Sequence, residues 1–285
     1  MRDLESQTCY WGDVSIQVEP SVATDSVHGV SVVRGLSYLS DGERTPDRAR
    51  LDLYLPRGQA RFPVIVSIHG GGLVEGDKSH DEFVGRRFAR SGIGTAVINY
   101  RLSPEVSHPV HVQDVAAAFA WVKRYIGEFG GRADDMFVIG HSAGAYLAAL
   151  LATDGRYLGR HGLTCKAIRG VVAVSGFFWV ERVAPDRPES VWGGDKRAWV
   201  DASPAHHLAP TLPPTLLLFA DGDQPARRRQ SLEMAQAARS LGNPNVELLE
   251  LAGRDHLSLW TGLAAPGDEV AERIIAFVRA FQASA

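Results

Sequence analysis

Cysteine is scarce in this chain, which has only Cys9 and Cys165 among its 285 residues. That count excludes a scaffold of several disulfides and leaves room for a single bridge between the two. Long hydrophobic runs are also missing, since no stretch approaches the roughly 20 apolar residues that a membrane-spanning helix needs. Residues 1–6 lack the apolar run of a secretion signal. We therefore expect no membrane partner and a cytoplasmic location.

An excess of one charge is likewise missing. The chain carries 30 basic and 33 acidic side chains, a formal net charge of −3, and the two signs are interspersed. This balance gives no reason to expect a nucleic-acid partner. The one basic run, residues 227–229, falls at an expected helix start, where we interpret it as a solvated face.

Metal and nucleotide motifs are missing as well. The chain has ten histidines, but it contains no His-Glu-x-x-His and no Cys-x-x-Cys spacing. Neither of the glycine patterns that open a phosphate-binding helix is present. We therefore expect no metal and no cofactor.

What the sequence does have is a regular alternation of apolar runs and helical patterns. Near-continuous apolar runs, typical of strands covered on both faces, lie at residues 64–68, 94–100, 136–139, 168–174, 215–219 and 246–251. Helical patterns lie at residues 81–91, 110–128, 142–153, 226–241 and 268–280. This alternation predicts an α/β fold, with a mostly parallel central sheet flanked by helices.

The ends of this pattern suggest further divisions of the chain. Residues 30–39 and 50–55 alternate in polarity, and the hairpin signal Asp41-Gly42 between them predicts an antiparallel N-terminal strand pair. Residues 1–28 are expected to form an N-terminal arm, and residues 29–285 a single domain.

One long stretch, residues 177–213, does not fit the alternation. It holds several large aromatic residues without clear periodicity: Phe177, Phe178, Trp179, Trp192 and Trp199. A connection of this length inside a compact domain is usually functional, so we expect a lid-like insertion or a pocket wall. The alternative is an ordinary excursion that packs on its own aromatic side chains.

The motif Gly140-His141-Ser142-Ala143-Gly144 stands between an expected strand and an expected helix. A strand that meets a helix at Gly-x-Ser-x-Gly forms a nucleophile elbow, a turn so tight that the serine hydroxyl projects from the sheet edge. The two glycines leave room for the chains to pass. Such a short pattern also arises by chance, and the strand-turn-helix context is what favours Ser142 as a nucleophile.

A serine nucleophile needs a base, which a carboxylate in turn holds in place. Where the serine lies on such an elbow, the chain order is serine, acid, histidine. His256 lies in a glycine-containing loop between the last expected strand and the last expected helix, where a base would reach over the sheet edge. Structural roles are the better interpretation for His206 and His207, which lie in the long stretch at residues 177–213, and His161 lies in a loop after the elbow helix.

The acid should follow the expected strand at residues 215–219. Both Asp221 and Asp223 stand there, and either could reach a histidine nitrogen at the carboxyl edge of the sheet. The spacing alone leaves both open.

A tetrahedral oxyanion needs donors that are already in place, and backbone N–H groups supply them most simply. The run His69-Gly70-Gly71-Gly72 directly follows an expected strand, and its glycines permit a backbone that aims amides at one spot. The amide of Ala143, directly after the nucleophile, supplies another donor.

Taken together, these motifs resemble the hormone-sensitive-lipase-like branch of the α/β-hydrolase carboxylesterases. The sequence is most similar to small bacterial esterases that also resemble feruloyl esterases and arylformamidases. The resemblance covers about residues 45–283. It is carried by residues 69–72, 76–78, 99–104, 108–109, 113–114, 121 and 140–144.

The resemblance also implies which carboxylate is the acid. In such enzymes it lies eight residues before a serine that opens a helix, within a Gly-x-x-Asp pattern. Ser231 matches that serine and implies Asp223 as the acid. Ala220 replaces the glycine of the pattern, so Asp221 stays open as the alternative.

The family pattern further implies that the amides of Gly71, Gly72 and Ala143 bind the oxyanion. The position after the glycines, which is often aromatic in the family, is Leu73 here. The shape of the acyl pocket, and with it the substrate, is therefore not fixed by the resemblance.

We thus predict a serine carboxylesterase with the α/β-hydrolase fold. Ser142, His256 and Asp223 would hydrolyse small to medium carboxylic esters through an acyl-enzyme intermediate, with a small-molecule ester as the substrate. One alternative is an arylformamidase that cleaves amides of the N-formylkynurenine type. Another is a non-catalytic protein of the same fold that binds a small molecule. Aromatic residues of the arm or the insertion would suit a homodimer interface.

Overall fold

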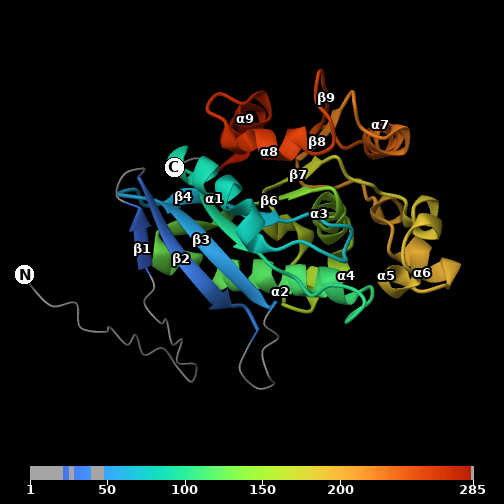
Figure 1. The fold of residues 1–285 in the computed structure, drawn as a ribbon, viewed down its shortest axis with the longest axis horizontal. Coiled ribbons are helices and arrows are strands. Elements are labelled where there is room, and N and C mark those ends of the chain that lie inside the picture. Colours follow the sequence, from blue (N-terminus) through green and yellow to red (C-terminus); the bar gives the residue numbers. More distant parts are fainter. Residues whose placement is uncertain (1–21, 26–28, 40–47, 284–285) are drawn as a thin grey trace, which may run out of the picture.

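A sheet of nine strands runs through the computed structural model, which describes residues 22–25, 29–39 and 48–283 (Figure 1). The strands are β1 (Val22–Asp25), β2 (Val30–Ser37), β3 (Arg50–Pro56), β4 (Phe62–Ile68), β5 (Gly94–Ile98), β6 (Gly131–His141), β7 (Gly170–Val174), β8 (Thr215–Ala220) and β9 (Val246–Leu251). Their order in the sheet is β1-β2-β3-β5-β4-β6-β7-β8-β9. All pairs from β5 to β9 are parallel, which confirms the predicted sheet.

The N-terminal strands are antiparallel, as the alternating pattern predicts. β2 pairs antiparallel with β3, and β3 in turn pairs antiparallel with β5. The Asp41-Gly42 turn lies outside the described residues. Within the expected arm, Val22–Asp25 forms β1, which pairs antiparallel with β2. Four residues are too few for a visible period, so this edge strand depends on its pairing with β2; the rest of the arm lies outside the described residues.

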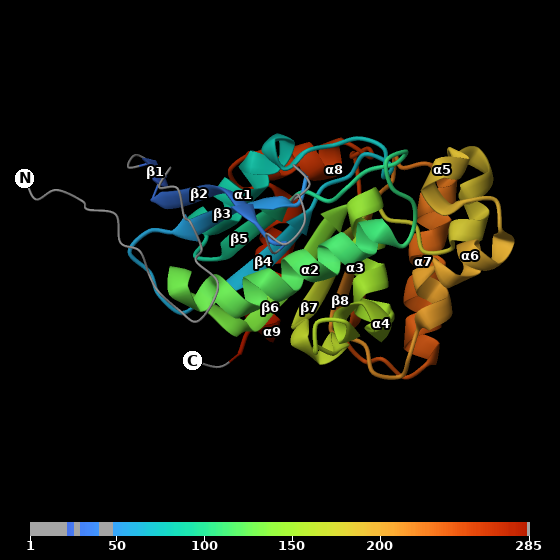
Figure 2. The same cartoon turned by 90° about the horizontal axis from the view of Figure 1, so that it is seen from below.

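Helices cover both faces of the sheet. On one face lie α1 (Glu82–Arg90), α8 (Ser258–Thr261) and α9 (Glu269–Phe281). On the other lie α2 (Val110–Tyr125), α3 (Ala143–Thr153) and α7 (Pro225–Ser240), seen together in Figure 2. The shorter helices are α4 (Gly155–Gly159), α5 (Glu189–Trp192) and α6 (Lys196–Asp201). Short 3₁₀ turns lie at Lys78–Asp81, Ile126–Phe129, Cys165–Ala167, Val180–Arg182, Ala184–Asp186, Pro204–His207 and Gly262–Ala264.

The central strands explain why their sequences are apolar without alternation. Every residue of β4 is buried. Val64 and Val66 pack toward α2 and α3, whereas Ile65 packs toward α1 and α9. Since successive side chains of a strand point to opposite faces, a strand covered on both sides must be apolar throughout.

The insertion at residues 177–213 packs against the start of α3 through an aromatic cluster. Phe177 stacks on Tyr146, with ring centres 4.8 Å apart, and Trp192 meets both rings edge-on at 5.9 Å. Trp192 Nε1 also donates a hydrogen bond to the Tyr146 hydroxyl (3.2 Å). Tyr146 lies one helical turn after Ser142, so these contacts bring the insertion to the edge of the sheet where Ser142 lies. A lid-like role for it stays a prediction.

Candidate active site

Ser142 occupies a sharp turn between β6 and α3. Its backbone has φ 56° and ψ −115°, a left-handed conformation that a serine adopts only under constraint. The flanking glycines permit the turn. A Cβ on Gly140 would lie 2.2 Å from the carbonyl carbon of Gly144, and a Cβ on Gly144 would lie 2.0 Å from the Ile68 oxygen. The motif therefore folds as the elbow that the sequence predicts.

The structure brings Ser142, His256 and Asp223 together at the carboxyl edge of the sheet. Ser142 Oγ lies 3.1 Å from His256 Nε2, and His256 Nδ1 lies 3.0 Å from Asp223 Oδ1. Ser142 and Asp223 are buried, whereas the His256 side chain keeps 29% of its surface exposed. Ser142 follows β6, Asp223 follows β8 and His256 follows β9. Since parallel strands present their carboxyl ends at the same edge of a sheet, the three residues meet there.

Asp221 and Asp223 occupy different positions after β8. Asp221 accepts hydrogen bonds from the amides of Gly253 (2.9 Å) and Arg254 (3.2 Å), and so connects the end of β8 to the loop that carries His256. Asp223 faces the imidazole. Burial would raise the pKa of Asp223, but hydrogen bonds from His256, Ser175 and the Ala220 amide outweigh it and lower the pKa. Asp223 is therefore ionised at neutral pH.

Ser175 is a member of this cluster that the sequence analysis does not single out. Its Oγ donates a hydrogen bond to Asp223 Oδ2 and lies 3.2 Å from His256 Nδ1. Like Ser142, it has a positive φ of 56°. Its position directly after β7 becomes informative only once β7 is placed between β6 and β8, because the carboxyl ends of neighbouring strands converge there.

His141 holds the backbone of His256. Its Nε2 donates a hydrogen bond to the His256 carbonyl oxygen (2.7 Å), and its ring stacks on Trp260, with centres 5.4 Å apart. Trp260 Nε1 donates in turn to Asp81 Oδ1 (2.8 Å). Burial, together with the nearby His256, lowers the pKa of His141 to about 3, so this ring is neutral.

The glycine-rich loop after β4 lies against Ser142. A Cβ on Gly70 would lie 3.4 Å from Ser142 Cβ. Among the hydrogen bonds of the described residues, none is donated by the amides of Gly71, Gly72 and Ala143. Within the described structure, the N–H groups of these three expected oxyanion donors are therefore free to bind another acceptor.

Two side chains brace this loop. His69 Nδ1 donates a hydrogen bond to the Gly70 oxygen (2.6 Å), and its ring stacks on Tyr100 at 4.4 Å. Arg48 Nη2 donates to the Gly76 oxygen (2.7 Å). Leu73, which stands where the family often has an aromatic residue, is fully buried in the core. Its side chain therefore does not line an open pocket.

The buried histidines make the fold sensitive to acid. Burial lowers the pKa of His69, His108 and His111 to about 4, and that of His141 to about 3. A histidine with a depressed pKa stabilises the fold above its unfolded pKa, and this contribution is lost as the pH falls toward the folded value. Burial raises the pKa of Asp81 to about 6. Its contribution to the free energy of unfolding therefore increases as the pH falls, opposite to that of the histidines. We expect the free energy of unfolding to fall by on the order of 5 kcal/mol between pH 7 and pH 5.

Urea denaturation at several pH values measures this slope. His111→Gln should flatten it, because one buried imidazole no longer titrates. His80→Gln replaces an exposed histidine and is the matched control, which should flatten the slope less than His111→Gln does. A wild-type stability that is equal at pH 7 and pH 5 would contradict the expectation.

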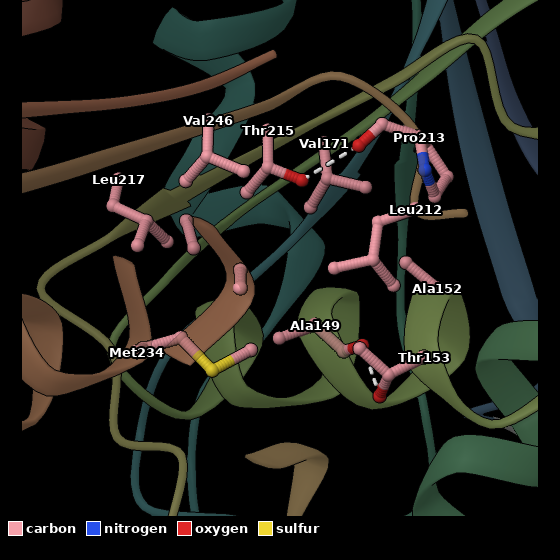
Figure 3. A pocket seen from close by; sticks show the side chains of 12 residues that line it. Ala149, Ala152, Thr153, Val171, Leu212, Pro213, Thr215, Leu217, Met234 and Val246 are labelled. Atoms are coloured by element: carbon pink, nitrogen blue, oxygen red, sulfur yellow. Dashed lines mark hydrogen bonds between the residues drawn. The ribbon is translucent and has the colours of Figure 1, made fainter. Parts of the chain in front are cut away.

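An apolar cavity lies elsewhere in the fold. Its walls include Ala149 and Thr153 of α3, Met234 of α7 and Val246 of β9 (Figure 3). These positions lie at the amino ends of the strands and the far end of α3, away from Ser142. With a volume of about 20 Å³, it holds no more than a water molecule, so it is not the substrate site.

The described residues offer neither a cluster of metal ligands nor a membrane-spanning helix. They contain no group of three or more His, Cys, Asp or Glu side chains placed to hold a metal ion. In the same residues, every helix is too short or too polar to cross a bilayer.

Comparison with known proteins places the chain in a family. The family model described as BD-FAE matches residues 51–238, more than half of the chain. Esterase LipC of Mycobacterium tuberculosis is 28% identical over an alignment of 212 residues that covers 68% of this chain and 52% of LipC. The chain spans about half the length of curated relatives such as this one.

Solved structures agree on the fold. A truncated carbohydrate esterase from gut microbiota has a TM-score of 0.77 at 20% identity, covering 90% of this chain and 98% of that one. An esterase of Pyrobaculum calidifontis has a TM-score of 0.66 at 27% identity, covering 81% of each chain. These matches confirm the resemblance found in the sequence: the chain belongs to the BD-FAE family, within the hormone-sensitive-lipase-like branch of the α/β-hydrolase carboxylesterases.

Proposed function

We propose that this protein is a serine carboxylesterase that hydrolyses small to medium carboxylic esters through an acyl-enzyme. The observation that carries the proposal is the hydrogen-bonded series from Ser142 Oγ to His256 (3.1 Å) and from His256 to Asp223 (3.0 Å). A hydroxyl, an imidazole and a buried carboxylate in this order are what serine acyl transfer requires.

The first half of the reaction forms the acyl-enzyme. Since Asp223 is ionised and only accepts, His256 Nδ1 carries a proton and Nε2 keeps its lone pair for Ser142. As Ser142 Oγ bonds to the ester carbonyl carbon, its proton passes to Nε2. The imidazolium then gives that proton to the alcohol oxygen as the carbonyl carbon–alcohol bond breaks.

The second half releases the acid. A water molecule gives a proton to His256 Nε2 and attacks the acyl carbon, and the Ser142 ester bond breaks as Oγ takes the proton back. In both halves the amides of Gly71, Gly72 and Ala143 would bind the oxyanion. One such donor is typically worth about 10²–10³ in turnover.

The roles of the neighbouring groups follow from their contacts. Ser175 donates to the second oxygen of Asp223 and so fixes the rotation of the carboxylate. His141 holds the main chain of His256 through the carbonyl oxygen. Both would act as positioning residues, because neither touches the reacting atoms.

Steady-state hydrolysis of 4-nitrophenyl esters from acetate to dodecanoate tests this function. We expect a maximum at short to medium acyl chains. N-formylkynurenine, measured in parallel, tests the arylformamidase alternative, which a preference for the formamide by orders of magnitude would favour. An enzyme that turns over neither substrate would be a binding protein of the same fold. A cytoplasmic location and a homodimer stay predictions.

A further inference from the structure

Two arginines lie beside the candidate active site without a role in the mechanism above. Arg227, at the start of α7, donates a hydrogen bond from Nη1 to the Ser175 carbonyl oxygen (2.8 Å). Its guanidinium carbon lies 5.8 Å from the centre of the Phe177 ring. The interpretation of residues 227–229 as a solvated face is therefore wrong for Arg227, which is half-buried because it faces the end of β7.

Arg187 comes from the insertion and reaches the glycine-rich loop. A Cβ on Gly72 would lie 2.8 Å from Arg187 Nη1, so the guanidinium rests directly against the Cα of this expected oxyanion residue. A side chain at position 72 would displace this guanidinium. The insertion thus brings a cation to the glycine-rich loop, and α7 brings another to the end of β7.

The charges of both guanidinium groups are poorly compensated, although the Asp223 carboxylate acts on Arg227 from a distance. Within the described part of the chain, Arg187 and Arg227 form no ion pair. Other arginines of this region are paired: Arg182 with Glu233, Arg197 with Asp195 (2.9 Å), and Arg228 with Glu250 (2.7 Å). Within the described residues Arg229 of α7 likewise forms no ion pair, so Arg187 and Arg227 are distinguished by their contacts with the glycine-rich loop and the end of β7.

The two cations also repel each other. Burial, together with the nearby charge of Arg187, lowers the pKa of Arg227 to about 10, although Asp223 acts against this. Arg227 nevertheless stays charged at neutral pH. Like charges that are partly removed from water cost free energy unless an anion compensates them. Such an arrangement next to a nucleophile is typical of a binding site for a charged substrate group.

We propose that Arg187 and Arg227 bind a carboxylate of the substrate, so that the enzyme prefers esters that carry a carboxylate group. This inference rests on the proposed esterase function. A guanidinium suits the task because its planar donors pair with both oxygens of a carboxylate. The carboxylate could belong to the acyl part or to the alcohol part of the ester.

Matched ester pairs test the proposal and distinguish these two positions. For the acyl part we would compare the 4-nitrophenyl monoester of adipic acid with 4-nitrophenyl hexanoate. For the alcohol part we would compare 4-acetoxybenzoate with its methyl ester. We expect kcat/KM of the wild-type enzyme to favour the charged ester at least about tenfold in one pair. Sodium chloride should reduce that preference, since salt screens the attraction.

Variants assign the preference to the arginines. Arg187→Gln should lower kcat/KM for the charged ester about 10- to 100-fold and change the neutral ester less than about threefold. Arg187→Lys should retain part of the preference. Arg227→Gln should act in the same direction. Arg197→Gln, also in the insertion but exposed and paired with Asp195, is the matched control and should change neither ester.

The outcomes separate this inference from the function on which it rests. Equal losses on charged and neutral esters would mean that the arginines are structural, and equal rates for both esters of each pair would also overturn the inference. Either result would leave the esterase function intact, because the neutral ester would still be hydrolysed. If Arg227→Gln does not fold, the result for Arg187→Gln alone tests the inference. The Arg187 side chain makes no hydrogen bond within the described residues, so its replacement should not affect folding.

Discussion

Replacing Ser142 with alanine is expected to lower kcat for 4-nitrophenyl esters at least about 10⁴-fold. No other described hydroxyl lies within hydrogen-bond reach of His256 Nε2. Ser175 Oγ contacts the opposite ring nitrogen, Nδ1, and donates to Asp223, so it cannot replace the nucleophile. The fold should persist, because alanine retains the Cβ and the hydroxyl makes no second hydrogen bond in the described structure.

Two measurements check this expectation. Hydrolysis is assayed with the most reactive ester of the acyl series, and a fluorophosphonate is added in parallel to follow covalent labelling by mass spectrometry. Wild-type protein should gain one phosphonyl group per chain, and Ser142→Ala should gain none. Ser240→Ala, an exposed serine at the end of α7, is the control and should behave as wild type. A Ser142→Ala variant with more than about one hundredth of the activity would refute the acyl-enzyme mechanism.

The sequence predicts the parallel part of the fold because the buried strands leave a strong signal. β4 is covered on both faces, so each of its positions must be apolar. Ser142 is predictable for a related reason. Its turn demands glycine at positions 140 and 144, where any side chain would strike the main chain. Such requirements are local, and a short pattern is enough to express them.

Other parts of the site depend on contacts that no local pattern records. Arg227 and Arg228 are adjacent in sequence, yet the first faces Ser175 and the second forms a surface pair with Glu250. Only the position of α7 on the sheet determines which of the two side chains faces the site. Ser175 is similar, because an isolated serine after an apolar strand carries no signal until the neighbouring strands are placed. β1 was missed since its pairing with β2, and not its composition, makes it a strand.

The choice between Asp221 and Asp223 also depends on contacts that no local sequence pattern records. The two carboxylates are two residues apart, and both follow β8. The amide of Asp221 still pairs with the Leu251 oxygen (3.0 Å), so the sheet continues to this position and its side chain meets the loop amides. The chain then turns, and Asp223 is the residue that faces His256. Spacing in the sequence does not reveal where such a turn begins.

Asp223→Asn is therefore expected to have the second-largest effect, a loss in kcat of about 10³–10⁴ at neutral pH. An asparagine can present an N–H to His256 Nδ1, which favours the tautomer whose Nε2 proton points at Ser142. That tautomer cannot accept the proton of the nucleophile. The variant should still fold, since the amide oxygen can accept the hydrogen bonds from Ser175 and the Ala220 amide.

Asp221→Asn is the matched comparison, because it makes the same chemical change two residues away. Its oxygen can still accept from one of the two loop amides, at Gly253 and Arg254. We expect kcat to fall less than about tenfold, and the free energy of unfolding to fall only slightly, because solvent can replace the lost hydrogen bond. Assays at pH 7 with urea denaturation of both variants would separate the roles. A loss at Asp221→Asn that equals the loss at Asp223→Asn would mean that the loop, and not the charge facing the imidazole, limits the reaction. A greater loss at Asp221→Asn would transfer the role of the acid to Asp221.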